Sequence, residues 1–238
     1  MNPTFDPDQL PVCNDELGLL AELVPLQAQN TIELGCGSAR LARALLERWP
    51  LCHVTGLEVD AVQHAKNLAH PQARLNFVAA GAQSVPFADA SFDLALMLKS
   101  LHHVPLDSMD RALAEVARVL RPGGHLYVSE PIYGGALNAL VKLYNDEGVV
   151  RPAAQAALDR ALQAGVHWEA AGERRFAQTV HFASFDDFAQ RMMYPSFADH
   201  RIDDGLLSQA RAAYAPHQGA DGAAFVRPLH VRVLRRKG

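Results

Sequence analysis

Apolar segments of strand length alternate with stretches of helical periodicity along the first half of the chain. Five segments have the composition of strands, at residues 31–34, 53–57, 75–78, 92–98 and 124–129. The fourth contains the unbroken apolar run from Leu94 to Leu98. Such a run is typical of a parallel strand that helices cover on both faces. These segments therefore predict a parallel sheet.

The stretches between these segments place apolar residues three and four positions apart. Leu41 and Leu45 begin one such stripe, and Met109, Leu113 and Val116 form another. Each stripe predicts a helix with one buried face. Because strands and helices alternate, we expect a doubly wound α/β fold with right-handed crossovers.

The alternation stops after Pro131. Residues 133–147 and 153–165 have the pattern of two successive helices, and no strand is expected between them. We therefore predict that residues 132–178 form a helical cap, inserted after the fifth strand of the sheet.

The alternation resumes beyond residue 178. The remaining elements are expected in the order helix, strand, helix and strand, at residues 184–193, 197–202, 205–214 and 225–235. In the last of them, Val231 and Val233 alternate with Arg232 and Arg235, which suits a strand next to the sheet edge. The whole pattern predicts a seven-stranded, mostly parallel sheet in a single domain over residues 1–238, with a core at 25–131 and a C-terminal completion at 179–238.

Composition narrows the class of partner. The chain has 238 residues, 49% of them hydrophobic, and a formal net charge of -4. Its basic residues form no face of the kind that phosphate neutralisation requires. We expect no nucleic-acid partner, and a homodimer is compatible with the sequence.

The cysteines and the N-terminal residues indicate the cellular compartment of the protein. Cys13, Cys36 and Cys52 are an odd number without the spacing of a metal site, so we expect neither disulfides nor a bound metal. The first residues lack the pattern of a secretory signal, and no apolar run approaches the roughly 20 residues that cross a bilayer. These features predict a cytoplasmic protein without a membrane partner.

A glycine turn joins the first predicted strand to the helix that follows. Gly35 and Gly37 let the backbone turn sharply and approach a ligand, and the helix start presents unpaired N–H groups. Glu58 ends the next strand, 21 residues after Gly37. A carboxylate there accepts hydrogen bonds from both hydroxyls of a ribose. Glu58 alone would indicate only a surface charge, but together with the turn it indicates an adenosine-containing cofactor.

Glu33 selects among such cofactors. It stands two residues before Gly35, where its carboxylate would repel the pyrophosphate of a dinucleotide. The dinucleotide fingerprint also requires a third glycine, which is missing near Arg40. An amino-acid ammonium group and a sulfonium group would both be attracted.

Residues 33–40, Glu-Leu-Gly-Cys-Gly-Ser-Ala-Arg, resemble motif I of the class I S-adenosylmethionine-dependent methyltransferases, specifically the type 11 family that includes the ubiquinone-biosynthesis enzymes. Residues 85–93, 101–104 and 120–124 are similar to later segments of the same family. The matches cover about residues 25–131 in the right order. The resemblance implies an enzyme that uses S-adenosylmethionine and releases S-adenosylhomocysteine.

The resemblance also implies which residues bind this cofactor. Those around the methionine part would be Glu33, Gly35, Cys36, Gly37 and Arg40. Glu58 would hold the ribose and Val59 would pack on the adenine. Met97 and Leu98 would lie under the methionyl and ribose portions.

The adenine loop departs from the family pattern. It reads Gly81, Ala82, Gln83, where the family usually has an aspartate at the first position. Backbone groups of Gly81 and Ala82, together with Gln83, can substitute for the lost carboxylate. We therefore expect weaker binding rather than none.

Methyl transfer is an in-line displacement, so alignment of the reactants supplies much of the catalysis, about 7–11 kcal/mol in well-oriented systems. A general base matters when the acceptor is a hydroxyl or an acidic carbon. His102, Glu130 and Tyr133 follow strand ends, where the ligand crevice of such a sheet opens, and they are the candidate catalytic residues. His103 and Lys99 meet the same test. For His102 and His103 we favour packing beneath the cofactor over acid–base catalysis.

The acceptor is expected to be a small molecule chosen by the cap. The cap aromatics Tyr133, Tyr144, Trp168 and Phe176 would either line its pocket or form the cap's own core. Two other functions stay open. One is a non-catalytic protein that binds S-adenosylmethionine, which the Gly81 departure favours. The other is an NAD(P)-dependent oxidoreductase, against which Glu33 and the missing glycine argue.

Overall fold

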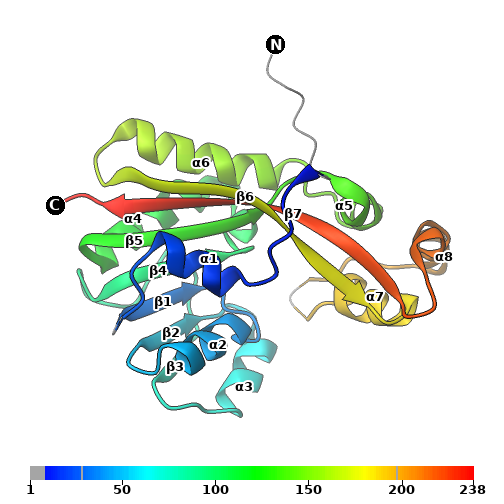
Figure 1. The fold of residues 1–238 in the computed structure, drawn as a ribbon, viewed down its shortest axis with the longest axis horizontal. Coiled ribbons are helices and arrows are strands. Elements are labelled where there is room, and N and C mark those ends of the chain that lie inside the picture. Colours follow the sequence, from blue (N-terminus) through cyan, green and yellow to red (C-terminus); the bar gives the residue numbers. More distant parts are fainter. Residues whose placement is uncertain (1–8, 28, 197) are drawn as a thin grey trace. The chain divides into compact units, whose positions relative to one another are not determined.

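The computed structural model describes residues 9–27, 29–196 and 198–238. Within them, seven strands form one sheet in the order β3-β2-β1-β4-β5-β7-β6 (Figure 1). The strands are β1 (Asn30–Leu34), β2 (His53–Leu57), β3 (Leu75–Val78), β4 (Phe92–Leu98), β5 (Leu120–Pro131), β6 (Trp168–Phe182) and β7 (Ala223–Arg236). The pairs formed among β1 to β5 are all parallel. The predicted doubly wound, mostly parallel sheet is confirmed.

The helices occupy the connections between the strands. They are α1 (Glu16–Leu23), α2 (Arg40–Arg48), α3 (Ala61–Leu68), α4 (Met109–Val119), α5 (Gly135–Val141), α6 (Val150–Ala164), α7 (Phe185–Phe188) and α8 (Asp204–Tyr214). A π-helical turn, Ala189–Met193, continues α7. None of these helices is long and apolar enough to cross a membrane, in the part of the chain that the structure describes.

The chain divides into two compact units. The core unit comprises Asp15–Glu130, Pro152–Arg174 and Val231–Gly238, and the cap unit comprises the described residues up to Asn14 together with Pro131–Arg151 and Arg175–His230. Strands β6 and β7 therefore contribute residues to both units.

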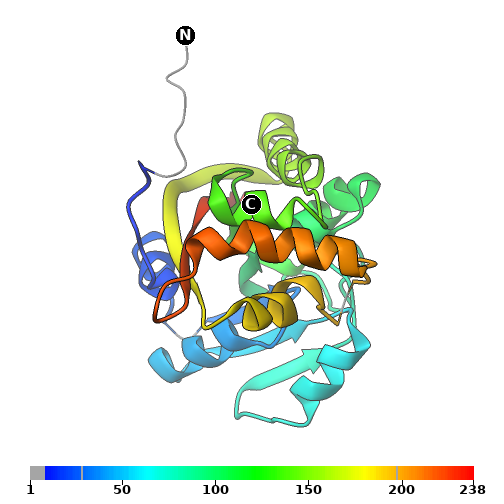
Figure 2. The same cartoon turned by 90° about the vertical axis from the view of Figure 1, so that its right-hand side faces the viewer.

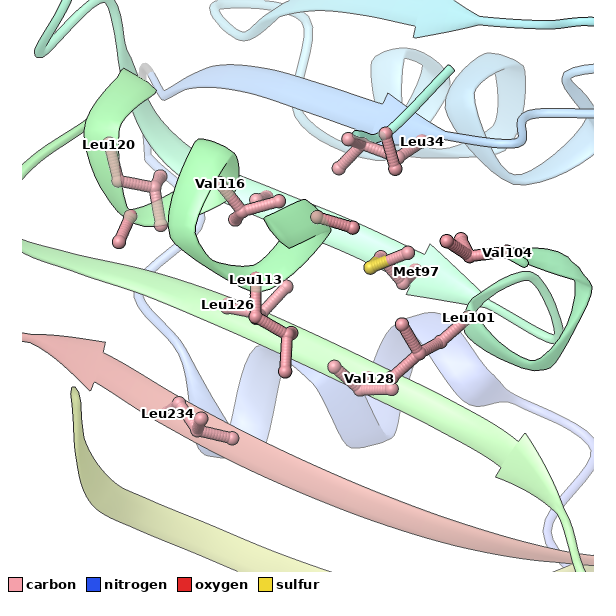
Figure 3. Close-up of a cluster of buried hydrophobic side chains, with 14 of the residues drawn as sticks. Leu34, Met97, Leu101, Val104, Leu113, Val116, Leu120, Leu126, Val128 and Leu234 are labelled. Carbon is pink, nitrogen blue, oxygen red and sulfur yellow. The ribbon is translucent and has the colours of Figure 1, made fainter. Parts of the chain in front are cut away.

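The core unit is built on a cluster of buried aliphatic side chains. Met97 of β4, Leu126 and Val128 of β5, and Leu113 and Val116 of α4 belong to it, and α4 lies over these strands (Figure 3). Helix α6 adds three further buried side chains, Ala154, Ala157 and Leu158. The apolar stripe of α4 therefore packs as its periodicity predicts.

The cap unit has an aromatic cluster of its own. Phe185, Phe188 and Tyr214 contact one another through their rings, and α7 and α8, which carry them, lie side by side (Figure 2). Tyr144 packs against the same cluster. Trp168, which we expected in the cap, instead belongs to the buried cluster of the core unit.

Three expectations about the second half of the chain need correction. The strand expected at 197–202 is wrong for residues 198–202, which form no strand, and residue 197 lies outside the described residues. The sixth strand is β6, within the segment predicted as a helical cap. Its exposed residues are charged, polar or small, so it lacks the apolar run that identified the central strands. Helix α6, also predicted as cap, packs in the core unit.

The end of β7 confirms the expectation for its alternating pattern. Val231 and Val233 are buried, and β7 lies between β5 and the edge strand β6. In Figure 3 the arrows of β5 and β7 point in opposite directions. The parallel arrangement therefore ends at this strand.

Candidate cofactor site

The turn after β1 is held in a conformation that favours glycine. Gly35 and Gly37 have φ of +73° and +52°, and the N–H groups of Gly35 and Cys36 both donate to the carbonyl of Leu57 at 2.9 Å. A Cβ on Gly35 would lie 2.8 Å from Cβ of Ser100, whereas a Cβ on Gly37 would meet no atom within 4 Å. Gly35 therefore permits close packing, and Gly37 borders open space.

Glu58 is joined directly to this turn. Its Oε2 accepts a hydrogen bond from the N–H of Gly37 at 2.7 Å, and its Oε1 accepts one from the N–H of Asp60 at 2.9 Å. Each carboxylate oxygen has a second lone pair. The structure thus brings together the two features, glycine turn and strand-end carboxylate, that the sequence indicated as a pair.

Asn67 is a contributor that the sequence did not reveal. It is buried on α3, and its Nδ2 donates to the carbonyl of Gly37 at 2.7 Å and lies 3.8 Å from Sγ of Cys36. The helix that follows β2 therefore fastens the turn from the side. No spacing or motif marks an asparagine for this role, because it depends on which face of α3 meets the turn.

The carboxyl group of Glu33, just before the turn, is buried and has a raised pKa. Its side chain is only 4% exposed, and burial raises its pKa to about 8, while Lys99 and a backbone hydrogen bond from Ala42 lower it and Glu16 and Glu58 raise it. Its Oε2 is buried without a hydrogen-bond partner. Such an atom loses its hydration without compensation, so it favours a ligand that donates a hydrogen bond.

Lys99 and Glu16 form an ion pair beside this group. Nζ of Lys99 donates to Oε2 of Glu16 at 3.1 Å, and Glu16, on α1, is buried. Glu16 was missed from the sequence because it lies outside the matched motifs. Lys99, a sequence candidate for proton transfer, is engaged in an ion pair.

Cys36 lies inside the turn. Burial raises the pKa of its thiol, and the nearby Glu33 and Glu58 raise it further. Since the thiolate is the reactive form of cysteine, Cys36 is a packing residue of the turn and not a nucleophile.

The remaining predicted cofactor residues lie at several depths. Arg40 is exposed at the start of α2, and Val59, just after β2, is 72% exposed. Gln83 folds back so that its amide lies beside Gly81, with Ala82 buried between them. Met97 is fully buried in the core cluster, and Leu98 is half-buried.

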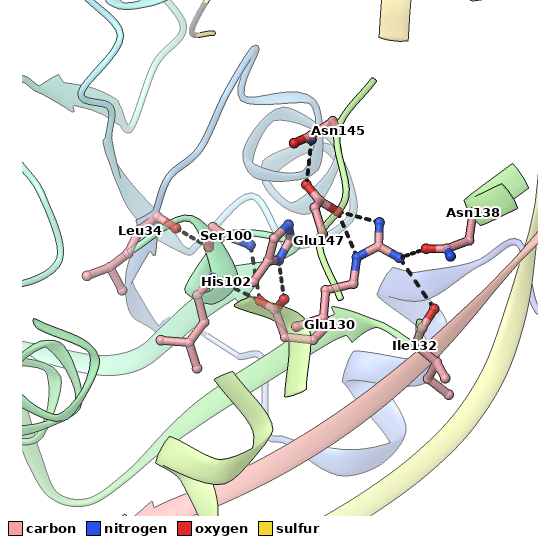
Figure 4. Close-up of polar contacts among 10 residues, drawn as sticks. Leu34, Ser100, His102, Glu130, Ile132, Asn138, Asn145 and Glu147 are labelled. Atoms are coloured by element: carbon pink, nitrogen blue, oxygen red, sulfur yellow. Dashed lines mark hydrogen bonds and ion pairs between the residues drawn. The ribbon is translucent and has the colours of Figure 1, made fainter. Parts of the chain in front are cut away.

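His102 and Glu130 form a buried pair in the core unit. Nδ1 of His102 lies within hydrogen-bond distance of Oε2 of Glu130, whose Oε1 accepts the N–H groups of Ser100 and Leu101 at 3.2 and 2.8 Å (Figure 4). Ser100 in turn donates its hydroxyl to the carbonyl of Leu34 at 2.7 Å. Because Glu130 accepts from the backbone, it is suited to accept the Nδ1 proton as well, which makes Nε2 the basic nitrogen of the ring.

Tyr133, the third candidate, belongs to the cap unit. Its hydroxyl donates to Oδ1 of Asp146 at 2.7 Å, and Nζ of Lys142 lies 5.7 Å from the centre of its ring. A hydroxyl that already donates to a carboxylate is a poor proton acceptor at neutral pH. Tyr133 thus forms a polar group with Asp146 and Lys142.

The core-unit residues fit S-adenosylmethionine. The unpartnered oxygen of Glu33 suits an ammonium group, and the paired oxygens of Glu58 keep lone pairs for ribose hydroxyls. The open space at Gly37 admits a ligand close to the backbone, and the exposed Val59 offers an apolar surface to a base.

Comparisons with known proteins match the core unit to methyltransferases. Residues 32–128 match the family model described as a methyltransferase domain. The chain is 36% identical over 115 residues to the O-methyltransferase rstn1 of Aspergillus nomiae, covering 45% of this chain and 49% of that protein. It is 36% identical over 107 residues to a fatty-acid O-methyltransferase of Mycolicibacterium smegmatis, covering 44% and 38%. It is 35% identical over 119 residues to the 27-O-demethylrifamycin SV methyltransferase of Amycolatopsis mediterranei, covering 47% and 42%. The chain thus spans less than half the length of these curated relatives.

Solved structures extend the likeness to almost the whole chain. A SAM-dependent methyltransferase of Methanosarcina mazei has a TM-score of 0.55 at 17% identity, covering 92% of this chain and 97% of that one. The [4+2]-cyclase SpnF has a TM-score of 0.59 at 21% identity, covering 94% and 80%. At these identities the likeness concerns the fold.

Proposed function

We propose that this chain is a class I S-adenosylmethionine-dependent methyltransferase that transfers a methyl group to an oxygen atom of a small organic molecule. The match of residues 32–128 to the methyltransferase domain and the similarity to O-methyltransferases support the proposal. The observation that carries the proposal is the buried, unpartnered oxygen of Glu33 beside a glycine turn that is hydrogen-bonded to Glu58. A site of this charge suits a ligand that combines an ammonium group with a ribose.

In this proposal, residues of the core unit hold the ligand. Glu33 binds the ammonium group, Glu58 binds the ribose hydroxyls, and Val59 packs on the adenine. The loop from Gly81 to Gln83 contributes backbone groups to the adenine edge. When bound, S-adenosylmethionine supplies a methyl group that its sulfonium has already activated.

His102 is the candidate general base. The Glu130 carboxylate orients the imidazole through Nδ1, so Nε2 is the atom that accepts the proton of an acceptor hydroxyl. Glu130 also holds the backbone of Ser100 and Leu101, which fixes the start of the loop that carries the histidine. For His102, this geometry supports a role in acid–base catalysis, whereas the sequence alone favoured packing beneath the cofactor.

The names of the relatives indicate the acceptor class. One is named for a fatty acid and another for a demethylated rifamycin, and both names specify oxygen as the methylated atom. We propose an apolar acceptor that bears a hydroxyl or carboxyl group. The alternative is a non-methylating protein on the same fold, which the likeness to a [4+2]-cyclase keeps open.

The test is an acceptor screen. Purified protein is incubated with S-adenosylmethionine and a panel of fatty acids, phenols and hydroxylated polyketides, and S-adenosylhomocysteine and methylated products are measured by mass spectrometry. We expect an O-methylated product from at least one apolar member, and loss of most of the rate in His102→Ala. Methylation confined to amines or thiols would refute the oxygen assignment, and binding of S-adenosylmethionine without any methyl transfer would favour the non-methylating alternative.

A further inference from the structure

Four ionisable side chains from different elements interact around the end of β1. Glu33 belongs to β1, Glu58 follows β2, Lys99 follows β4 and Glu16 belongs to α1. Lys99, Glu16 and Glu58 each influence Glu33 electrostatically, and Lys99 is the cation among them. The group thus combines three carboxyl groups and one ammonium group in the core unit.

The backbone of Lys99 is fixed at this place. Its N–H donates to the carbonyl of Ser129 at 2.7 Å, and its φ of +57° lies in the left-handed region, which a lysine rarely adopts. The next residue, Ser100, fills the space that a Cβ on Gly35 would need, and its hydroxyl donates to the carbonyl of Leu34. The side chain therefore starts beside the glycine turn, and its ammonium group reaches Glu16.

The structure holds the ammonium group of Lys99 against the carboxylate of Glu16, and its charge also acts on Glu33. Its side chain is 26% exposed, whereas that of Glu16 is 7% exposed. A partly buried ion pair is screened less than a surface pair, so its charge acts on ligands in the same site. Glu16 offsets part of this charge, and the two residues together set the local potential.

We propose that Lys99 determines how strongly this site prefers the positively charged methyl donor over its uncharged-sulfur product. The inference rests on the proposed function. S-adenosylmethionine and S-adenosylhomocysteine share the ammonium, carboxylate and ribose groups and differ in the charge on sulfur. A fixed cation near Glu33 therefore opposes the donor more than the product, while Glu16 acts in the opposite direction.

Lys99 also acts on the carboxyl groups in the absence of ligand. Its ammonium group offsets the negative charge of Glu16 and favours the ionised form of Glu33. The same charge then competes with the sulfonium when the donor binds. The site gains stability without ligand and loses part of its preference for the donor.

The experiment is calorimetric titration of the full chain with each ligand separately, in one buffer at one pH. The measured quantity is the ratio of the Kd for S-adenosylhomocysteine to the Kd for S-adenosylmethionine. Any cost of ionising Glu33 cancels in this ratio, because both ligands carry the same ammonium group. We expect Lys99→Met to raise the ratio about three- to tenfold, as for unit charges roughly 10 Å apart in a medium between protein surface and water.

Three further variants make the test specific. Glu16→Gln should lower the ratio, because it removes a negative charge and leaves the Lys99 charge without its partner. Lys99→Arg keeps the charge and should leave the ratio unchanged. Lys66→Met removes an exposed lysine of α3 and should also leave it unchanged. Circular dichroism and thermal unfolding verify that each variant is folded.

The outcomes separate this inference from the proposed function. If the wild-type chain binds both ligands and Lys99→Met changes the ratio less than twofold, the role of Lys99 is refuted and the proposed function stands. A fall in the ratio in Lys99→Met would refute it equally. If the folded wild-type chain binds neither ligand, the proposed function itself fails. Should Lys99→Met not fold, a ratio that does not fall in Glu16→Gln refutes the inference.

Discussion

At the scale of single residues, Glu33 and Glu58 were recognisable from the sequence, but their surroundings were not. Spacing placed both carboxylates beside the glycine turn, and the hydrogen bond from Gly37 to Glu58 agrees with that placement. Burial raises the pKa of Glu33, and Lys99 and Glu16, which are remote from it in the sequence, lower and raise it by smaller amounts. Asn67 was missed for the same reason, since its contact with Gly37 is set by helix packing.

Glu33 makes stability depend on pH. Its pKa is raised from 4.5 to about 8 in the folded chain, so between these values the unfolded chain releases a proton that the folded chain retains. The free energy of unfolding therefore falls as pH rises through this window and levels off above it. Glu33→Gln removes this titration. Between pH 5 and pH 9 we therefore expect the free energy of unfolding of the variant to rise relative to that of the wild type by a few kcal/mol, on the order of the value that the pKa shift allows.

Urea unfolding at pH 5, 7 and 9 measures this difference. Glu115→Gln is the matched control, because the pKa of Glu115 is lowered by Arg118 and its stabilisation is lost only in acid, as pH falls through its folded value. Its difference from the wild type should be constant over the window. Parallel pH profiles for Glu33→Gln and the wild type would contradict the assigned titration.

The two glycines of the turn should respond differently to alanine. In Gly35→Ala the new Cβ meets Ser100 at 2.8 Å and φ is +73°, so we expect a loss of about 3 kcal/mol of stability. In Gly37→Ala the space is open and φ is +52°, so the loss should be about 1 kcal/mol.

Gly37→Ala should nevertheless weaken S-adenosylmethionine binding at least tenfold, because its methyl group occupies the space offered to the ligand. Gly123→Ala, also at positive φ with open space, controls for strain and should bind normally. Thermal unfolding and calorimetry on the three variants provide the comparison. Equal affinities in Gly37→Ala and Gly123→Ala would place the ligand elsewhere.

At the scale of elements, the pattern of apolar residues in the first half of the chain predicted most of the helices and strands there. The ranges expected for β2, β3 and β4 agree with the structure, because buried parallel strands are apolar throughout. β6 was missed, since its exposed positions are mixed and Gly172 lies within it. α6 begins at Val150, so Pro152 falls within its first turn, where proline is tolerated.

The end of β5 gives an element-level prediction about catalysis. Glu130→Gln keeps an oxygen for the N–H groups of Ser100 and Leu101, but a neutral amide no longer stabilises a protonated His102. We expect the kcat of methyl transfer to fall about 10²-fold while the Kd for S-adenosylmethionine changes little. Glu115→Gln in the core unit is the control, because its wild-type carboxylate likewise accepts a backbone N–H group, that of Val85, and pairs with Arg118; its kcat should equal that of the wild type.

Steady-state kinetics with the acceptor found in the screen measures this effect. A kcat of Glu130→Gln equal to that of the wild type would contradict the general-base assignment. A rise in KM for the acceptor without a change in kcat would assign Glu130 to positioning of the loop alone.

At the scale of the whole molecule, the two units differ in how much the sequence reveals. The matched family segment, residues 32–128, lies entirely in the core unit, so its motifs predict the cofactor site. The cap unit contains the aromatic cluster of α7 and α8 and lies outside that segment. The aromatic side chains of this cluster pack against one another, so their sequence pattern reflects the packing of the unit and does not identify the acceptor.

The central claim is that the core unit binds S-adenosylmethionine through Glu33, Glu58 and the turn between β1 and α2. Isothermal titration of the folded chain and of Glu58→Gln, which loses one of the two carboxylate oxygens bonded to the backbone, tests it directly. We expect one S-adenosylmethionine per wild-type chain and at least tenfold weaker binding by the variant. Absence of binding by the folded wild type, or equal affinity in Glu58→Gln, would contradict it.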